Sequence, residues 1–515
     1  MSTSHHSRRH LSDVLAATAH RFPDKPALVF REHTLTWREV DEQVNALAKA
    51  FIELGIVHGD RIGIFCPPRP EYVITYIAAA RVGAILTGFN INYTAREIIE
   101  YGQLVEPVTM LIVGDLGVAE QLQPLLSEMP YILRGIAIGE DAPPGMLCFD
   151  QLLTDGATLP DAPLLARIQT LDEEDGALIV FTGGTTGTPK PALLSHKNIV
   201  ANIEAQNRAV GFVHTDRIIQ HLPMNHVSGC VLITVGAIVS GATLYLLDRF
   251  HPVAALELIQ RERITILGQV PTMFAMELLA PEFPEFDLSS LRKVIVAGAP
   301  TPEPLMRQIA RLAPIAIHGY GLTEAAGMVT YTAQADGVGT LLRSVGKAPP
   351  EVEVRIVDGV REPLAQGEIG EIALRSEFVM RGYFGNPTAT AEQIDAAGWL
   401  YTGDLGRLHD DGYLEIMGRR KEMYISGGYN VYPVEVEAYL MSHPKIAACA
   451  CIGRPDPVMG EVGMVFVVPH AGETLRGKEV REFCKIGLAR YKNPRYVQVI
   501  DCLLYTSPSP RDGTK

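Results

Sequence analysis

The sequence lacks an excess of basic residues. Its 45 Lys and Arg residues stand against 59 Asp and Glu, which gives the 515-residue chain a formal net charge of −14. Nucleic acids and anionic membranes are bound by basic surfaces, so this balance argues against both as general partners. An anionic small molecule stays possible, because a local group of cations and backbone amides can bind it within an acidic protein.

The chain also has few cysteines, and none of them forms a Cys-x-x-Cys pair. Seven are scattered along 515 residues. This pattern gives little support to a zinc site or a thiol-redox site and fits a reducing cytoplasm. Cys449 and Cys451 lie two apart in a predicted strand, so we expect both on one face, buried as small apolar groups.

No segment is typical of a secretory leader or a membrane span. The stretch from Met1 to His10 is polar and has no apolar core, so we expect no secretory signal. Cys230 to Leu247 is almost wholly apolar, but Gly236 and the pair Ser240-Gly241 interrupt it. We therefore predict a buried helix followed by a buried strand, no transmembrane segment and a cytoplasmic location.

Short β-branched runs alternate with amphipathic stretches through most of the sequence. In Trp37 to Leu54, apolar residues recur near a period of 3.6, which predicts a helix. The alternation indicates an α/β fold with much parallel sheet and ligands at the carboxyl ends of its strands. The predicted strands are Arg61–Phe65, Met110–Val113, Ala177–Phe181, Ile264–Leu267, Val294–Ala297 and Ile315–Ile317.

The pattern changes after about Gly418. Pro433 opens a short helix, two strands follow at Ile446–Ile452 and Gly463–Val468, and a helical stretch runs from Gly477 to Arg490. No fixed-period repeat or long linker is present. We predict a large domain over residues 1–418 and a small mobile α+β domain over 419–515, joined by a hinge near Arg420 and Lys421.

The segment from Phe181 to Lys190 has the composition of a triphosphate cradle. Glycines let backbone amides approach a ligand, hydroxyls donate hydrogen bonds, and a lysine adds a cation. It follows a predicted strand and precedes a helix that Ser195 is expected to cap. It is not a P-loop, because Pro189 precedes the lysine. The candidate residues are Thr182, Gly183, Gly184, Thr185, Thr186, Gly187 and Lys190.

This segment resembles the phosphate loop of the adenylate-forming superfamily, which includes acyl-CoA synthetases, aryl-CoA ligases, luciferases and adenylation domains. The family pattern is Thr-Ser/Gly-Gly-Thr-Thr-Gly-x-Pro-Lys-Gly. Pro191 replaces the last glycine here, which stiffens the exit from the loop and leaves the cradle intact. The resemblance implies a large multi-sheet α/β domain with a small domain behind a hinge.

Further matches follow in the family's order over roughly residues 20 to 503. His318-Gly-Tyr-Gly-Leu-Thr-Glu324 is similar to the Tyr-Gly-x-Thr-Glu signature. The resemblance implies that Tyr320 packs on adenine, Thr323 meets the α-phosphate region, and Glu324 holds Mg²⁺ together with Thr182. His318, Gly319 and Gly321 complete this nucleotide-binding segment.

The remaining motifs place the ribose, the hinge and the thiol. Tyr401-Thr-Gly-Asp404 resembles the element whose carboxylate accepts both ribose hydroxyls, and Gly418-Arg-Arg-Lys-Glu422 resembles the hinge. By resemblance, Arg419 reaches the ribose, Lys421 is the pivot, and the Gly427-Gly428 loop shapes the thiol tunnel. Two lesser matches add Gly298, Ala299 and Pro300 to the nucleotide site and His226 to the acyl pocket. A satisfied core histidine is an equally weighted alternative for His226.

The resemblance implies an AMP-forming acid–thiol ligase. ATP and Mg²⁺ would activate a carboxylic acid as its adenylate, with Lys190, Thr186, Glu324 and His226 in the catalytic set. Coenzyme A would then take the acyl group. Small and aliphatic candidate pocket residues, without a cation, favour a fatty or aryl acid. A homodimer is compatible with this scheme.

The pattern breaks after Asp501. The family continues with Leu-Pro-x-Thr-x-x-Gly-Lys, whose lysine contacts the substrate carboxylate and the AMP phosphate during adenylation. Here that position falls near Pro510, and Lys515 lies later on a Ser/Pro-rich tail. Residues 504–515 are therefore off the pattern, and we expect them to be disordered. Either they are a sequence artefact resembling translated adapter, or the chain is impaired in its first half-reaction.

Three other functions stay open at this point. The same adenylation chemistry could feed a carrier-protein thiol, although no carrier-like domain follows in this sequence. A nucleotide- or acyl-binding homologue without turnover would fit the missing lysine. A luciferase-like oxygenase is a remote alternative.

Overall fold

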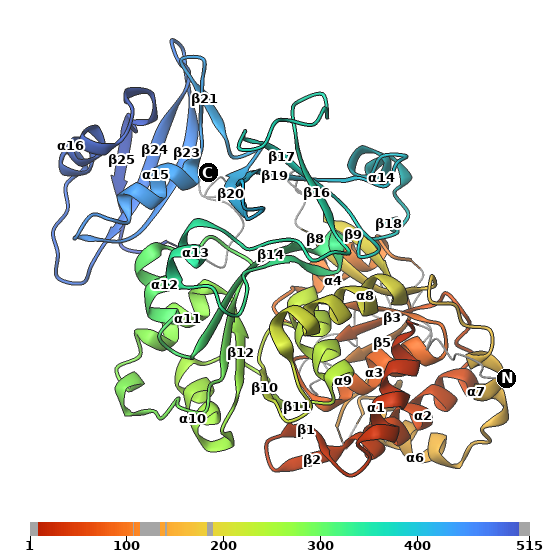
Figure 1. Cartoon of the computed structure of the whole chain (residues 1–515). Coiled ribbons are helices and arrows are strands. Elements are labelled where there is room, and N and C mark those ends of the chain that lie inside the picture. The colour runs from red at the N-terminus through yellow and green to blue at the C-terminus, as the bar shows by residue number, and fades with distance from the viewer. Residues whose placement is uncertain (1–8, 107, 114–133, 140–141, 183–188, 504–515) are drawn as a thin grey trace.

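The computed structural model describes residues 9–503 apart from 107, 114–133, 140–141 and 183–188. These residues form four β-sheets with helices packed between and around them (Figure 1). The predicted α/β class, with a large multi-sheet domain and a small C-terminal one, is confirmed. The predicted phosphate loop at 183–188 and the off-pattern residues 504–515 lie outside the described residues.

Two eight-stranded sheets make up most of the large domain. Both are mainly parallel, as the alternation of strands and helices predicts. In sheet order, the first contains β15 (Gly327–Tyr331), β14 (Ile315–Leu322), β13 (Lys293–Val296), β12 (Ile266–Gln269), β10 (Arg217–Gln220), β11 (Thr243–Leu246), β1 (Pro26–Phe30) and β2 (His33–Thr36). The second contains β18 (Gly382–Tyr383), β9 (Lys190–Ser195), β8 (Gly176–Thr182), β4 (Ile85–Gly88), β3 (Arg61–Phe65), β5 (Val108–Val113), β6 (Arg134–Ala137) and β7 (Met146–Cys148).

Helices cover both faces of the first sheet. The main core joins its inner face to the second sheet through α1 (Leu11–Arg21), α2 (Trp37–Glu53), α3 (Pro70–Arg81) and α8 (His196–Gln206). A separate core fills the outer face under α10 (Pro252–Glu262), α11 (Pro271–Leu278) and α12 (Glu303–Ile309). Burial of these apolar faces stabilises the layers by roughly 25 cal/mol per Å² removed from water.

Several sequence signals of helix boundaries are confirmed. Ser195 caps α8, and its hydroxyl accepts from the backbone N–H of Asn198 at 3.1 Å. The apolar run from Cys230 is a helix followed by a strand: η2 (Ser228–Val235), which has π-helical hydrogen bonding, continues into α9 (Gly236–Ser240) before β11. Gly241, at φ +72°, makes the turn between them. Within the described chain, no helix is long and apolar enough to cross a membrane.

The third and fourth sheets lead to the C-terminus. β16 (Glu353–Val357), β17 (Gly370–Arg375), β19 (Leu400–Leu408) and β20 (Leu414–Arg419) form an antiparallel sheet. The fourth contains β21 (Tyr424–Ser426), β22 (Tyr429–Val431), β23 (Ile446–Asp456), β24 (Gly460–Pro469) and β25 (Tyr496–Val499). It packs with α15 (Pro433–Leu440) and α16 (Gly477–Gly487) around a core of its own.

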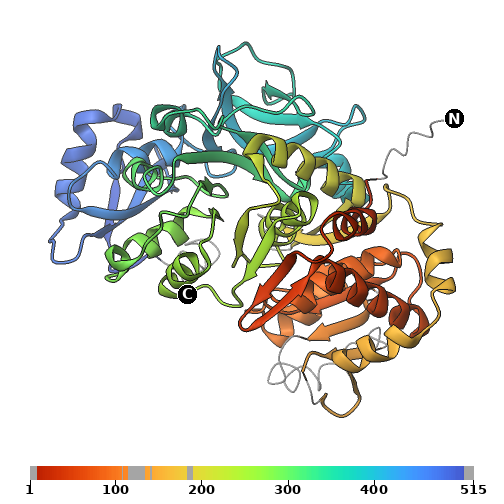
Figure 2. The ribbon, with the colours of Figure 1, turned by 60° about the horizontal axis from the view of Figure 1, so that its bottom comes forward.

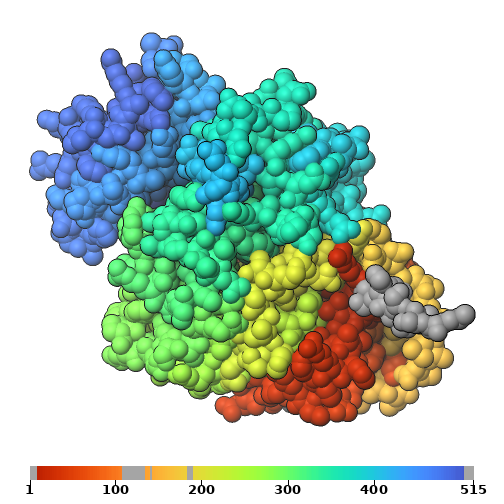
Figure 3. Space-filling model, viewed as in Figure 1, coloured from red at the N-terminus to blue at the C-terminus, as the bar shows by residue number. Residues whose placement is uncertain are grey.

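This last sheet and its helices form a distinct lobe. They lie at one end of the molecule, far from the N-terminal helices, in both ribbon views (Figure 2), and they stand out at the upper left of the space-filling view (Figure 3). Cys449 and Cys451 both contribute to its core, as their spacing predicts, and both are free thiols. The domain boundary at residues 418 and 419 stays a prediction.

Candidate active site

A β-hairpin carries the two ends of the predicted phosphate loop. β8 and β9 are antiparallel, and Thr182 faces Lys190 at the end of the hairpin where the connecting loop begins. The Thr182 hydroxyl donates to the Lys190 carbonyl at 3.3 Å. The hairpin therefore places the Lys190 side chain at the mouth of the segment that would hold phosphates.

Glu324 comes to the same place from a distant part of the chain. It lies in the short helix η4 (Thr323–Ala325), directly after β14, and its backbone carbonyl accepts from the N–H of Met380 at 2.8 Å. Thr323, half-buried, begins the same turn. The strand β18 follows Met380 and pairs with β9, so Glu324 and Lys190 are held by one connected set of strands.

Tyr383 links Glu324 and Lys190, although it is not among the predicted site residues. Its hydroxyl donates to Glu324 Oε1 at 2.8 Å, and the Lys190 ammonium lies 5.0 Å from the centre of its ring. Burial, and then the neighbouring carboxylate, raise the pKa of Tyr383 well above its usual value, so it remains a hydrogen-bond donor.

A second group of predicted residues surrounds Asp404 on β19. The Tyr320 hydroxyl donates to Asp404 Oδ2 at 2.6 Å, and the Arg419 guanidinium lies 3.2 Å from Oδ1. Burial raises the pKa of Asp404, whereas the Tyr320 hydrogen bond and the Arg419 charge oppose the rise. Tyr320, Asp404 and Arg419 thus come from three strands to form one polar cluster.

The two glycines of the Tyr320 segment have a packing role. The predicted strand ends at Ile317, but β14 runs on to Leu322 and pairs with β15. A Cβ at Gly321 would lie 2.2 Å from the Gly327 carbonyl oxygen, and one at Gly319 only 2.0 Å from the Met328 methyl carbon. The expected strand end is therefore wrong, because close approach of β15 already requires glycine here.

His318 is fixed from behind the strand. Its Nδ1 lies 2.9 Å from the Leu341 carbonyl oxygen and 3.1 Å from that of Ser344. Two acceptors on one side assign the proton to Nδ1. Burial lowers the pKa of His318, and the two carbonyls oppose this change only in part. His318 therefore remains a neutral residue that orients β14.

The predicted acyl-pocket residue His226 and the predicted nucleotide-site residues 298–300 lie in loops after β10 and β13, two strands that β12 separates. His226 has exposed surface in the turn that follows β10, while the protein packed around it lowers the pKa of its ring through burial. Gly298, Ala299 and Pro300 are exposed directly after β13. Gly298 has φ +90°, and a Cβ there would lie 3.3 Å from Val270 Cγ1. These loops follow the carboxyl ends of parallel strands, where α/β sheets bind ligands.

The predicted hinge and thiol-loop residues lie beyond this region. Lys421 is exposed between β20 and β21. Gly427 and Gly428 form the two-residue turn between β21 and β22, with φ +59° and +86°. Positive φ at both positions is typical of a type I′ hairpin turn and favours glycine. In Figure 1, β21 lies at the upper end of the small lobe, away from β8 and β9.

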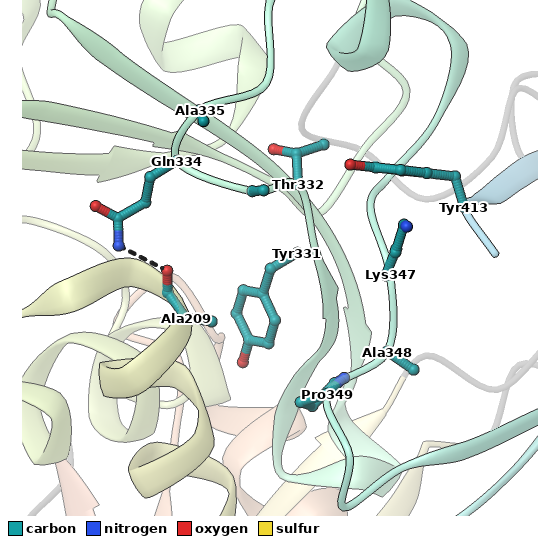
Figure 4. A pocket seen from close by; sticks show the side chains of 10 residues that line it. Ala209, Tyr331, Thr332, Gln334, Ala335, Lys347, Ala348, Pro349 and Tyr413 are labelled. Atoms are coloured by element: carbon teal, nitrogen blue, oxygen red, sulfur yellow. Dashed lines mark hydrogen bonds between the residues drawn. The ribbon is translucent and has the colours of Figure 1, made fainter. Parts of the chain in front are cut away.

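A separate hollow of about 460 Å³ lies beside β15 (Figure 4). Tyr331, Gln334, Lys347 and Tyr413 contribute to its wall, and the Gln334 amide donates to the Ala209 carbonyl at 3.0 Å. The Lys347 ammonium lies 4.4 Å from the centre of the Tyr413 ring. The described residues around this hollow include none of the predicted site residues, so it is distinct from the site above.

Comparison with known proteins agrees with these features. The family model of the AMP-binding enzyme matches residues 15–384, and that of the AMP-binding enzyme C-terminal domain matches 435–507. The putative acyl-CoA synthetase YngI of Bacillus subtilis is 33% identical over 511 residues, covering 95% of this chain and 93% of its own. The medium-chain acyl-CoA ligase ACSF2 of Homo sapiens is 33% identical, with 96% and 84% covered.

A solved structure has the same architecture. The anthranilate CoA ligase AuaEII, in complex with anthranoyl-AMP, superimposes with a TM-score of 0.87 at 26% identity, covering 96% of this chain and 94% of its own. The family-model matches span both the large and the small parts of the chain. The chain is therefore an enzyme of the adenylate-forming, AMP-binding superfamily and belongs to its acyl-CoA ligase family.

Proposed function

We propose that the chain is an ATP-dependent acyl-CoA synthetase for an apolar carboxylic acid. In the first step the carboxylate attacks the α-phosphorus of ATP, a P–O bond breaks, and pyrophosphate leaves the acyl-adenylate. In the second the CoA thiolate attacks the acyl carbon and AMP leaves. The observation that carries this proposal is the contact chain Lys190–Tyr383–Glu324 at the mouth of the β8–β9 hairpin.

Lys190 and Glu324 have the charges that the first step needs. An ammonium group held beside the hairpin would stabilise negative charge as it develops on the phosphates. Asp404, which already accepts from Tyr320, has the acceptor oxygens for ribose hydroxyls. Arg419 shares that carboxylate and would reach the same sugar.

The donor set beside Lys190 fits Mg²⁺, because it offers hard oxygen atoms: the Glu324 carboxylate and the Thr182 hydroxyl. Glu324 uses one carboxylate oxygen for Tyr383. A bound Mg²⁺ would supply neutralisation of phosphate charge. We assign the cation to Glu324 and Thr182 as part of the proposal.

A fatty or aryl acid fits the candidate pocket. Val270 Cγ1 lies 3.3 Å from where a Cβ of Gly298 would stand, so these two residues would offer such an acid an apolar surface. Two relatives bear names of this kind, the medium-chain acyl-CoA ligase ACSF2 and the anthranilate CoA ligase. We therefore propose an acid that enters with an apolar chain or ring and its carboxylate towards Lys190.

The test measures AMP release from ATP over a panel of straight-chain and aromatic acids, with CoA or an acyl-carrier protein as the acceptor. CoA-dependent AMP release is expected. AMP release with the carrier protein but not with CoA would identify the carrier thiol as the acceptor in the second step. A parallel reaction supplies synthetic acyl-AMP and CoA, so the thioester step is measured without adenylation. A further version of the chain ends in the family's Leu-Pro-x-Thr-x-x-Gly-Lys element in place of residues 504–515.

Glu324→Ala provides the sharper control. It should abolish Mg²⁺-dependent pyrophosphate release, whereas retained activity would remove the metal assignment. If no acid supports AMP or pyrophosphate release in either version of the chain, the synthetase proposal is wrong.

A further inference from the structure

Three buried polar side chains lie under the two loops that carry the candidate acyl pocket. His221 follows the last residue of β10, Gln269 ends β12, and Glu277 lies in α11. Their exposed fractions are 4%, 4% and 2%. They belong to the outer face of the first sheet, next to the apolar core that contains Phe274.

These side chains form a contact set around Gln269. Its amide Nε2 donates to Glu277 Oε2 at 2.5 Å, and the parallel pairing of β10 with β12 places Gln269 beside His221. The His221 ring makes an edge-on contact with Phe250, with centroids 5.5 Å apart. Both His221 nitrogens, Gln269 Oε1 and Glu277 Oε1 have no hydrogen-bond partner within the described part of the chain.

Such a set is costly as mere packing. A buried polar group without a partner loses its hydrogen bonds to water without replacement, and apolar residues of similar volume would avoid this cost. Two uncharged states keep the cost tolerable: burial raises the pKa of Glu277 to about 8 and lowers that of His221 to about 3. At neutral pH the set consists of a carboxylic acid, an amide and a neutral imidazole.

The positions of His221 and Gln269 in the chain link these buried side chains to the loops proposed to bind the carboxylic acid. His221 directly precedes the segment that leads to His226. Gln269 directly precedes Val270, whose Cγ1 meets the Cβ position of Gly298. Gln269 is therefore adjacent in sequence to Val270 on one side of the candidate pocket. It also lies next to His221, which begins the segment leading to His226 on the other side.

We propose that Gln269, anchored by Glu277 and lying beside His221, is a positioning residue that fixes the His226 and Val270 segments relative to each other and thereby determines which acids the pocket accepts. This inference rests on the proposed acyl-CoA synthetase function. Gln269 acts through the two loops and does not touch the reacting atoms.

The test measures binding to the full chain by calorimetry, with AMP and with the sulfamoyl-adenosine analogues of octanoyl-AMP and benzoyl-AMP. Gln269→Leu should weaken at least one acyl analogue about tenfold and change the ratio of the two Kd values, while AMP binding stays within twofold. AMP lacks the acyl group, so it serves as the control for the nucleotide site and for folding.

Glu277→Gln provides the conservative variant. It keeps a neutral acceptor for the Gln269 amide and should bind the analogues like the wild type at pH 7. Above pH about 8 the wild type should lose affinity for the acyl analogues as Glu277 ionises, whereas Glu277→Gln should not. His221 is the titratable group beside it in this set, and it stays neutral over that range. Glu282→Gln removes an exposed carboxylate near the same helix and should leave both profiles unchanged.

The outcomes separate the two proposals. If the wild type binds neither acyl analogue, the synthetase function is wrong and this inference falls with it. If the wild type binds them and Gln269→Leu leaves both affinities and their ratio unchanged, the positioning role alone is wrong. Equal alkaline profiles for the wild type and Glu277→Gln would also overturn it.

Discussion

Tyr383 contacts both charged side chains of the proposed first step, Lys190 and Glu324. Tyr383→Phe removes the hydroxyl that donates to Glu324 but keeps the ring beside Lys190. A hydrogen bond to a charged acceptor contributes about 1.5–3 kcal/mol, so adenylation should slow about tenfold or more. Pyrophosphate release with the best acid of the panel measures the effect.

Tyr413→Phe is the matched control for that variant. The Tyr413 hydroxyl donates to Asp336 at 2.7 Å, so the same kind of bond is lost outside the candidate site. Adenylation by Tyr413→Phe should stay near the wild-type rate. Equal losses in the two variants would mean that Tyr383 acts only through stability.

His196 gives a prediction on stability at the residue scale. It is fully buried, its ring contacts the tilted ring of His10 with centroids 3.7 Å apart, and both its nitrogens lack partners among the described residues. Burial holds the pKa of His196 well below 6.5. The unfolded chain therefore takes up a proton that the folded chain excludes, and stability falls as the pH drops below about 6.5, by about 1.4 kcal/mol per pH unit for this group.

His196→Leu should remove that part of the pH dependence. The free energy of unfolding, measured with urea at pH 7 and at pH 5.5, should fall less for the variant than for the wild type. His470→Leu replaces an exposed histidine and should follow the wild-type slope. A wild-type slope in His196→Leu would show that His196 is protonated in the folded state.

At the scale of elements, much of the fold could be predicted from periodicity and capping. The strand Arg61–Phe65 and the helix from Trp37 were placed closely because both are regular and mostly buried. The end of β14 was placed wrongly. Glycines usually interrupt strands, and only the approach of β15, which no local pattern shows, explains why the strand continues through them.

The residues of the candidate site likewise divide into those that a sequence motif predicts and those that only a distant contact explains. Glu324 and Asp404 lie in ordered motifs that resemble the family, so their neighbourhoods could be predicted. Tyr383 and Gln269 could not, because their roles depend on contacts with Glu324 and Glu277 that no sequence motif records.

Gly321 offers a test of the β14–β15 pairing. In Gly321→Ala the new Cβ would lie 2.2 Å from one backbone oxygen and 2.5 Å from Met328 Cα, and backbone atoms cannot move aside cheaply. Overpacking of this kind costs about 1–3 kcal/mol, so Tm should fall by several degrees. Gly339→Ala, in α13 (Val338–Arg343) with open space around the new Cβ, should keep or raise Tm. A Gly321→Ala protein as stable as the wild type would contradict the pairing.

At the scale of the whole molecule, two consecutive arginines at the end of β20 tie the chain to the large domain before it enters the small lobe. Arg419 pairs with Asp404, and Arg420 pairs with Glu371 at 2.7 Å. Glu371 is nearly fully buried, and its other carboxylate oxygen accepts from the Gly403 N–H at 2.9 Å. The Arg420 backbone N–H donates to the Gly403 carbonyl at 2.9 Å. The segment about which the small lobe would rotate is thus held to the large domain by two ion pairs and a backbone hydrogen bond.

Glu371→Gln tests how firmly this segment is held. The amide can still accept from Gly403 but cannot form the ion pair with Arg420, so the stretch between β20 and β21 should open more often. Tryptic cleavage at Arg419, Arg420 or Lys421 should then accelerate about tenfold, since a loss of about 1.4 kcal/mol raises the open fraction by that factor.

Glu353→Gln is the control for this variant. It breaks an exposed ion pair with Arg375 in the same sheet and should leave the cleavage rate unchanged, because exposed pairs contribute little. Cleavage of Glu371→Gln at the wild-type rate would mean that the backbone hydrogen bond to Gly403 holds this segment without help from the ion pair.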